Sequence, residues 1–277
     1  MKRKIAIVTG ASSGIGEATA ELLASSGFTV YGTSRRGARP GQNSFKMISL
    51  DVNSEESVEA AINEVIKLEG RIDLLVNNAG FGVAPGGAEE SSIEQAKTIF
   101  DTNFFGIVRT TRAVVPYMRK QGEGRIINIG SVLGFLPAPY MALYAATKHA
   151  VEGYSESLDH ELRLRGIRVS VIEPAYTNTQ FDANTQQVDS KIPEYDVERA
   201  ALNKLVKIAV EGGDDPKVVA KVVLKAANAS RPRLRYTAGK LACSLSIFRR
   251  FAPEALVDVG IRKEMKLDSL DKIARQP

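Results

Sequence analysis

Residues 5–16 read Ile5-Ala-Ile-Val-Thr9-Gly10-Ala-Ser-Ser-Gly14-Ile-Gly16, and they predict a strand, a tight turn and the start of a helix. The apolar, β-branched run is typical of a buried parallel strand. A helix that begins directly after a glycine turn points its backbone N–H groups and its positive end at one place, which suits a pyrophosphate. The glycine spacing is G-x-x-x-G-x-G rather than the commoner G-x-G-x-x-G. We expect these residues to bind a dinucleotide: Gly10, Ser12, Ser13, Gly14, Ile15 and Gly16.

Short apolar runs that read as strands recur along the chain. They lie at 29–33, 47–50, 73–76, 125–129 and 168–172, and helical patterns separate most of them. Strands that alternate with helices form right-handed parallel crossovers, so the pattern predicts an α/β fold, a doubly wound parallel sheet of the Rossmann type. Ligands of such sheets bind at the carboxyl ends of the strands.

Helix boundaries can also be predicted. Asn53 is expected to cap one helix, which stops at Gly70. A long helix is expected from about residue 93 to 120, and another ends at Gly166. The glycine-rich segment 81–91 is expected to be a mobile connection.

We predict one dinucleotide-binding catalytic domain at 1–237, which includes a lid at about 176–213. A C-terminal helical extension at 238–277 is expected to pack on the same domain. The net charge of +5 is uneven: residues 231–277 hold 11 basic and 5 acidic residues, a net of +6. The extension is therefore expected to pack over the substrate cleft or against a neighbouring subunit, or else to lie on an anionic membrane, with the first preferred. Positive charge confined to this tail argues against a nucleic-acid partner.

Composition narrows the class of protein. The 277 residues are 44% hydrophobic and 25% charged, which is an ordinary globular balance. A lone cysteine, Cys243, excludes an internal disulfide and a cysteine-based metal site, and we expect no metal. No run approaches the ~20 apolar residues of a membrane span, so a cytoplasmic location is expected.

The second strand ends in Ser34-Arg35-Arg36. An acidic side chain at this place would favour NAD through the ribose 2′-hydroxyl, whereas arginine pairs with a 2′-phosphate. The sequence therefore predicts NADP(H), with Arg35 as the main anchor and Ser34 or Arg36 assisting. The alternative is an ordinary solvated arginine.

Tyr144 and Lys148 are four residues apart in Tyr-Ala-Ala-Thr-Lys, so both lie on one face of a helix. A nearby ammonium favours the phenolate, which predicts a Tyr144 pKa below its usual value near 10. Such a phenol can exchange a proton with a carbinol oxygen, and Ser131 would hold that oxygen by a hydrogen bond. Taken alone, the pair also fits an ordinary surface helix.

Together these motifs resemble the short-chain dehydrogenase/reductase family, in its ordinary single-domain branch. The matching segments are Thr9–Gly16, Asn77–Gly80, Asn103, Ser131, Tyr144–Lys148 and Pro174–Thr179, in the family's order. The resemblance implies that Tyr144 is the general acid/base, that Ser131 orients the substrate oxygen, and that Lys148 lowers the tyrosine pKa and binds the nicotinamide ribose. It implies that Asn103 holds a water in the proton relay. It also implies further cofactor contacts: Asp51, Val52, Asn78, Ala79, Gly80, Pro174, Ala175, Thr177 and Thr179.

Three positions depart from the family's pattern. Ala175 replaces the usual glycine after the proline, and it would be strained if this site needed a positive φ. Thr147 replaces the usual serine before the lysine, and Gly130 replaces a common serine before Ser131.

The sequence predicts an NADP(H)-dependent enzyme that interconverts a carbonyl and an alcohol, on a lipophilic substrate by analogy with the branch that handles retinoids and steroids. The expected substrate-binding residues are Ser131, Leu133, Met141, Tyr144, Tyr176 and Phe181. A homodimer or homotetramer is expected from the family. A non-catalytic NADP-binding sensor or scaffold is the alternative, but it would not need Ser131, Tyr144 and Lys148 together.

Overall fold

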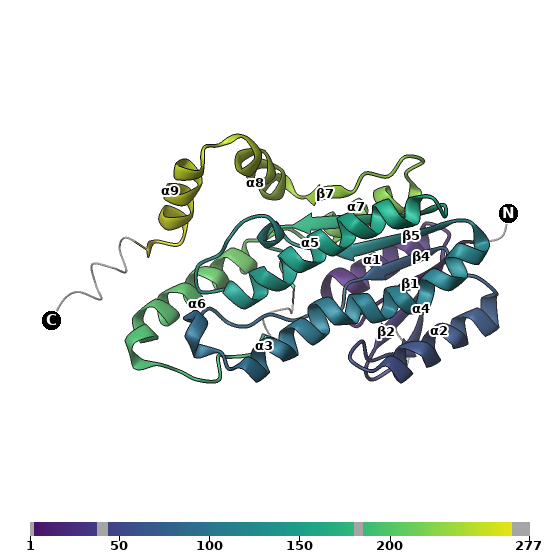
Figure 1. Ribbon diagram of the computed structural model, residues 1–277, viewed down its shortest axis with the longest axis horizontal. Coiled ribbons are helices and arrows are strands. Elements are labelled where there is room, and N and C mark those ends of the chain that lie inside the picture. Colours follow the sequence, from purple (N-terminus) through teal and green to yellow (C-terminus); the bar gives the residue numbers. More distant parts are fainter. Residues whose placement is uncertain (1–2, 38–43, 180–184, 268–277) are drawn as a thin grey trace.

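The computed structural model describes residues 3–37, 44–179 and 185–267 of the chain. Its centre is a seven-stranded parallel sheet in the order β3-β2-β1-β4-β5-β6-β7 (Figure 1). The strands are β1 (Ile5–Val8), β2 (Thr29–Ser34), β3 (Lys46–Ser49), β4 (Leu74–Asn77), β5 (Gly124–Ile129), β6 (Ile167–Pro174) and β7 (Arg235–Ala238). The order reverses between β1 and β4, so a crevice is expected at their carboxyl ends. The predicted doubly wound fold is confirmed.

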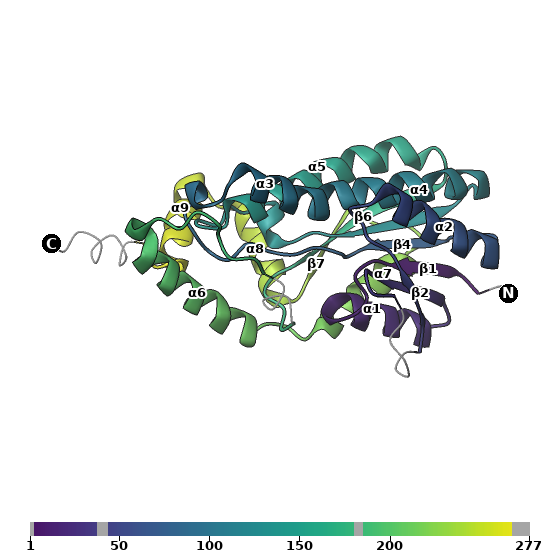
Figure 2. The same ribbon diagram turned by 90° about the horizontal axis from the view of Figure 1, so that it is seen from below.

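Helices cover both faces of the sheet (Figure 2). One face carries α1 (Gly14–Ser25) and α7 (Pro216–Asn228), whose apolar residues form one core with β1 and β5. The other carries α2 (Glu55–Glu69), α4 (Gly106–Gln121) and α5 (Ala142–Arg163), which enclose a second core. Because both faces are covered, β1 and β4 are buried along their whole length, and Asn77 at the end of β4 is their one polar residue.

Four further helices lie toward the carboxyl ends of the strands or beyond them. They are α3 (Ile93–Phe100), α6 (Asp196–Glu211), α8 (Lys240–Phe251) and α9 (Glu254–Glu264). Met265, just after α9, packs against Leu202 of α6, and Arg249 of α8 donates a hydrogen bond to the Phe135 carbonyl at 3.2 Å. Among the described residues, no helix is both long and apolar enough to cross a membrane.

The long helix predicted from about 93 to 120 is confirmed: α3 and α4 are continuous through a π-helical turn at Asp101–Phe105. Two other local predictions are wrong. Ser54, not Asn53, caps α2, because its Oγ accepts the Ser57 N–H while Asn53 reaches across to Thr102. Segment 81–91 is largely buried and is held by hydrogen bonds to residues from other parts of the chain, such as that from Ala84 N–H to the Gln186 carbonyl at 2.8 Å.

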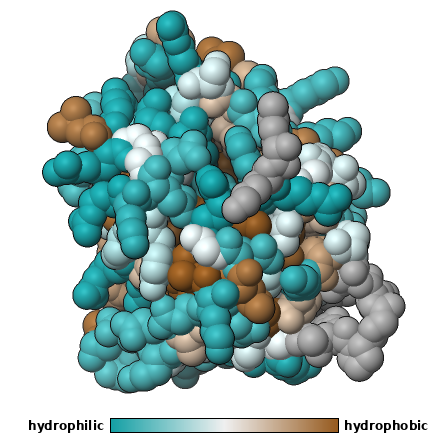
Figure 3. All heavy atoms as spheres, turned by 90° about the vertical axis from the view of Figure 1, so that its right-hand side faces the viewer, coloured by the Kyte–Doolittle hydropathy of each residue, from teal (hydrophilic) through white to brown (hydrophobic). Residues whose placement is uncertain are grey.

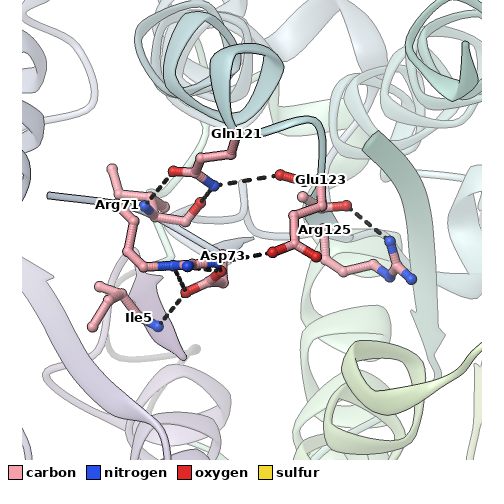
Figure 4. Close-up of polar contacts among 8 residues, drawn as sticks. Ile5, Arg71, Asp73, Gln121, Glu123 and Arg125 are labelled. Atoms are coloured by element: carbon pink, nitrogen blue, oxygen red, sulfur yellow. Dashed lines mark hydrogen bonds and ion pairs between the residues drawn. The ribbon is translucent and has the colours of Figure 1, made fainter. Parts of the chain in front are cut away.

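A buried carboxylate fixes the opposite end of the sheet. Asp73 accepts the Ile5 N–H at 2.7 Å and pairs with Arg71, which also contacts Glu123 at 2.9 Å (Figure 4). The Gln121 amide accepts the Ile72 N–H at 3.0 Å. These contacts join the start of β4 to β1 and to the connection that leads into β5. Figure 3 shows this end of the molecule, where hydrophilic side chains predominate.

We expect Asp73→Ala to lower the free energy of unfolding by about 1–3 kcal/mol, because it leaves the buried Ile5 N–H without an acceptor and Arg71 with Glu123 alone. Urea unfolding followed by circular dichroism measures the change. Glu123→Gln is the matched control, because Glu123 contacts the same arginine from an exposed position, and it should cost less than about 1 kcal/mol. Equal losses in the two variants would contradict the assignment.

Candidate active site

The turn between β1 and α1 has no room for side chains at its glycines. A Cβ at Gly16 would lie 2.2 Å from the Gly10 carbonyl oxygen and 2.5 Å from Asn78 Nδ2. Gly14 has a φ of +59°, which favours glycine. The side chain of Ser13, at the N-cap of α1, makes no capping hydrogen bond, so the first N–H groups of this helix face the turn without a side-chain acceptor. This cradle fits the pyrophosphate of a dinucleotide, and it contains all six predicted turn residues.

The residues after β4 build the wall behind this turn. Asn78 Nδ2 donates to the Thr9 and Gly10 carbonyls at 3.0 and 3.1 Å. The Thr9 hydroxyl accepts the N–H groups of Asn78 and Ala79 at 2.9 and 3.0 Å. A Cβ at Gly80 would lie 2.9 Å from the Asn103 side-chain oxygen. Asn78, Ala79 and Gly80 therefore lie where the sequence placed them, beside the glycine turn.

Ser131, Tyr144 and Lys148 meet beyond the carboxyl end of β5. Ser131 Oγ accepts the Leu133 N–H at 3.1 Å, and the Ser131 side chain is hydrogen-bonded to the Tyr144 hydroxyl. Lys148 lies one turn further along α5, with Nζ 5.5 Å from the centre of the Tyr144 ring. Its ammonium donates to the Ile129 carbonyl at 2.9 Å. The structure thus brings the three predicted catalytic side chains together.

The predicted lowering of the Tyr144 pKa is wrong for this chain. Burial raises the pKa of Tyr144 to about 12, and the hydrogen bond with Ser131 opposes this rise without cancelling it. Burial also lowers the pKa of Lys148 to about 8, against the attraction of the Glu152 carboxylate. Burial removes both side chains from water, and this desolvation disfavours both the tyrosinate and the ammonium. Tyr144 therefore keeps its proton at neutral pH.

Asn103 lies in the π-helical turn and is buried. Its Oδ1 accepts the Phe81 N–H at 3.0 Å, and its Nδ2 donates to the Phe81 carbonyl at 2.9 Å and to the Thr147 hydroxyl at 3.3 Å. The side chain thus connects segment 81–91 to the residue before Lys148. In this structure it holds the backbone and Thr147, so its expected role in a proton relay stays a prediction.

The predicted adenosine contacts lie at the ends of β2 and β3. Arg35 and Arg36 are exposed, and neither forms an ion pair with any residue in the described ranges. The Ser34 hydroxyl donates to the Gly37 carbonyl at 3.3 Å. Val52 is buried, while the Asp51 carboxylate accepts the Asn53 N–H at 3.0 Å. Two guanidinium groups are thus available beside the strand end where a 2′-phosphate would lie.

The loop after β6 completes the predicted cofactor contacts. A Cβ at Gly14 would lie 3.2 Å from Thr179, so this threonine lies against the glycine turn. Thr177 bridges to Asp214. Ala175 does not have a positive φ, so alanine is unstrained here and the departure from the family's glycine is tolerated. Phe181 lies outside the described residues.

A small pocket opens beside Tyr144. Of the predicted substrate residues, Tyr144 and Met141 line it, whereas Ser131, Leu133 and Tyr176 do not. Sequence analysis missed most of its wall: Val83, Ala84, Gly86, Gly87, Tyr140, Leu143 and Val188 are among its lining residues. The glycine cluster at 86–87 was a signal for close packing, since a Cβ at Gly86 would lie 2.6 Å from a Val188 methyl group.

Two distant segments form the outer wall of this pocket and are joined by a buried ion pair. Val83 forms a parallel bridge with Gln186. Glu90 is fully buried, pairs with Arg199 of α6 and accepts the Ile192 N–H at 2.8 Å. We call segments 82–91 and 185–199 the paired wall. The predicted lid is therefore attached to the connection that follows β4.

Comparisons with known proteins agree with this geometry. Residues 4–190 match the family model for short chain dehydrogenase. The chain is 37% identical to 3-ketodihydrosphingosine reductase of Bacteroides thetaiotaomicron over 95% of this chain and 98% of the relative. A short-chain dehydrogenase/reductase from Burkholderia phymatum in complex with NAD has a TM-score of 0.76 at 27% identity and covers 90% of this chain and 93% of its own. Serine dehydrogenase complexed with NADP+ has a TM-score of 0.71 at 28% identity, with coverages of 84% and 93%. The chain therefore belongs to the short-chain dehydrogenase/reductase family.

Proposed function

We propose that this protein is an NADP(H)-dependent oxidoreductase that interconverts a carbonyl and an alcohol on a lipophilic substrate. The observation that carries the proposal is the meeting of Ser131, Tyr144 and Lys148 at the sheet edge that also holds the glycine turn. A sensor or scaffold that only binds the dinucleotide would need the turn but not these three side chains.

In this reaction each of the three side chains has its own role. When bound, the nicotinamide supplies or accepts the hydride. Tyr144 gives its proton to the oxygen of the carbonyl as it becomes an alcohol, and Ser131 donates a hydrogen bond to the same oxygen. Because burial raises the pKa of Tyr144, the phenol is protonated at neutral pH and ready for the reductive direction. Lys148, when protonated, favours the tyrosinate that remains after proton transfer.

The preference for the phosphorylated cofactor rests on Arg35. No acidic side chain follows β2 directly, and Arg35 and Arg36 are exposed where a ribose 2′-phosphate would lie. An arginine–phosphate contact is charge-assisted and often bidentate, so one arginine suffices for discrimination.

A lipophilic substrate is favoured by the hydrophobic cluster that packs against Tyr144, which includes Val83, Leu143 and Val188. Apolar side chains beside a reacting oxygen exclude water from it and favour hydrocarbon groups. The relative that is 37% identical is named for a ketone on a sphingoid chain. We therefore propose a carbonyl carried by a long hydrocarbon group.

The test is the oxidation of NADPH and NADH against small ketones, retinal, ketosteroids and 3-ketodihydrosphingosine. We expect turnover with at least one lipophilic carbonyl and kcat/KM about tenfold or more higher with NADPH, because the 2′-phosphate contact is worth more than about 1.4 kcal/mol. Equal kcat/KM with both cofactors would refute the NADP(H) preference. Failure to reduce any carbonyl, together with failure to oxidise the corresponding alcohols, would refute the proposed reaction.

A further inference from the structure

Behind the catalytic helix lies a buried cluster of charged groups that the proposed reaction does not use. Glu152 is four residues after Lys148 on α5, and both side chains are buried, with 7% and 8% of their surface exposed. Residues at this spacing share one face of a helix. Glu173, at the carboxyl end of β6, is 2% exposed. Arg235 of β7 faces both carboxylates, so one guanidinium serves two buried acids.

Two glycines make room for the Glu152 carboxylate. A Cβ at Gly130 would lie 3.2 Å from Glu152 Oε1, and one at Gly134 would lie 3.3 Å from the same atom. Gly130 directly follows Ile129, whose carbonyl accepts the Lys148 ammonium at 2.9 Å. The carboxylate and the ammonium therefore lie against the same turn of backbone, although no direct ion pair joins them among the described residues.

The two oxygens of Glu152 have different surroundings. Oε2 accepts Arg235 Nε at 2.9 Å, whereas buried Oε1 has no hydrogen-bond partner within the described part of the chain. A buried carboxylate oxygen without a partner costs free energy, so its retention calls for a compensating interaction. Lys148 lies nearby and forms no ion pair with any acidic residue in the described ranges. A carboxylate in a poorly solvated site attracts such a positive charge over several ångströms.

We propose that Glu152 is a positioning residue for the catalytic centre: its carboxylate, held by Arg235 and accommodated by Gly130 and Gly134, keeps Lys148 protonated beside Tyr144. This inference rests on the proposed function only for its effect on turnover. It concerns the charge of Lys148, which can be measured without any substrate.

The other charged groups around Glu152 allow it to keep its negative charge. Arg235 is closer to Glu152 than to Glu173, at 2.9 Å against 3.7 Å. Burial and the neighbouring Glu152 raise the pKa of Glu173 to about 7, so Glu173 accepts the shared proton readily as the pH falls. Burial raises the pKa of Glu152 itself, and the contact with Arg235 opposes this rise; on α5, Glu156 raises the same pKa and His149 lowers it.

The experiment measures the pKa of Lys148 by NMR titration of the full chain with ¹³C-labelled lysine, and the Lys148 signal is assigned by its loss in Lys148→Met. In Glu152→Gln we expect this pKa to fall by about one unit or more, because the amine loses its nearest negative charge. Glu152→Asp should restore most of the difference, since it keeps the carboxylate. If Glu152→Gln does not fold, Glu152→Met provides a second neutral side chain of similar length.

Glu156→Gln is the matched control. Glu156 also contacts Arg235 at 2.9 Å, but its side chain is half exposed and lies one turn further from Lys148. Its removal should leave the Lys148 pKa unchanged, so a general disturbance of Arg235 is separated from the loss of charge at residue 152. In turnover, the alkaline limb of the pH profile should move to lower pH in Glu152→Gln only, because Lys148 then loses its proton earlier.

An unchanged Lys148 pKa in Glu152→Gln, or an equal fall in Glu156→Gln, would overturn the inference. Its failure is distinct from that of the proposed function. A wild-type protein that reduces no carbonyl refutes the reaction, whereas the titration of Lys148 still decides whether Glu152 controls its charge.

Discussion

Tyr144→Phe should lose roughly 10²–10⁴-fold in turnover, the usual contribution of a positioned general acid. The substitution removes one hydroxyl and leaves the ring that lies beneath the Lys148 ammonium. NADPH affinity should stay within about threefold of wild type, since the glycine turn and Arg35 are untouched and threefold is less than 1 kcal/mol. Steady-state kinetics and fluorescence titration of NADPH measure the two effects separately.

Tyr154→Phe is the matched control for this loss. Tyr154 lies on the same helix and its hydroxyl is hydrogen-bonded to Thr111, away from Ser131. Its removal should cost stability by about 1 kcal/mol and leave kcat unchanged. Wild-type turnover in Tyr144→Phe would show that another group transfers the proton and would falsify the assignment of Tyr144.

Gly16→Ala should nearly abolish dinucleotide binding. The new Cβ would lie 2.2 Å from a backbone carbonyl and 2.5 Å from the Asn78 amide, so the turn itself must move. A displacement that costs about 3 kcal/mol corresponds to roughly 100-fold in affinity. Calorimetric titration with NADPH gives the affinity, and thermal unfolding shows whether the fold survives.

Gly153→Ala provides the comparison for a glycine that packing does not require. A Cβ at Gly153 of α5 meets no atom within 4 Å. Alanine there should stabilise the helix by up to about 1 kcal/mol and leave NADPH affinity unchanged. Similar affinity losses in the two variants would mean that the turn is not the dinucleotide cradle.

The fold and the polar edge of the site were predictable because their signals are local. The unit from β1 to the start of α1 is encoded in twelve consecutive residues, and each strand from β1 to β6 carries a predicted site residue at its carboxyl end. Parallel topology then gathers these ends without further information from the sequence. The spacing of Tyr144 and Lys148 on one helix is equally local.

The errors come from long-range contacts. Asn53 and Ser54 are both good caps, and Asn53 is diverted by Thr102, which lies 49 positions away. The glycine-rich segment 81–91 was expected to be mobile, but the ion pair between its Glu90 and Arg199 holds it in place. Arg199 lies 109 positions further along the chain, so the local sequence gives no sign of this contact.

The pKa error has a similar origin. Helical spacing shows that Lys148 lies near Tyr144, but it does not show how far both are removed from water. In the structure desolvation is the largest influence on both groups, and it acts against the charge on each.

The paired wall also constrains how this enzyme could be redesigned. A chimera that takes one of its two segments from a relative without the matching charge would leave either the Glu90 carboxylate or the Arg199 guanidinium unpaired in the protein interior, and an unpaired interior charge costs about 3–5 kcal/mol. Donor sequences for the segments flanking the pocket must therefore be transplanted as a matched set. Where the parents differ at this pair, recombination breakpoints that keep residues 82–91 and 185–199 from one parent should yield folded libraries, and breakpoints that divide them should not.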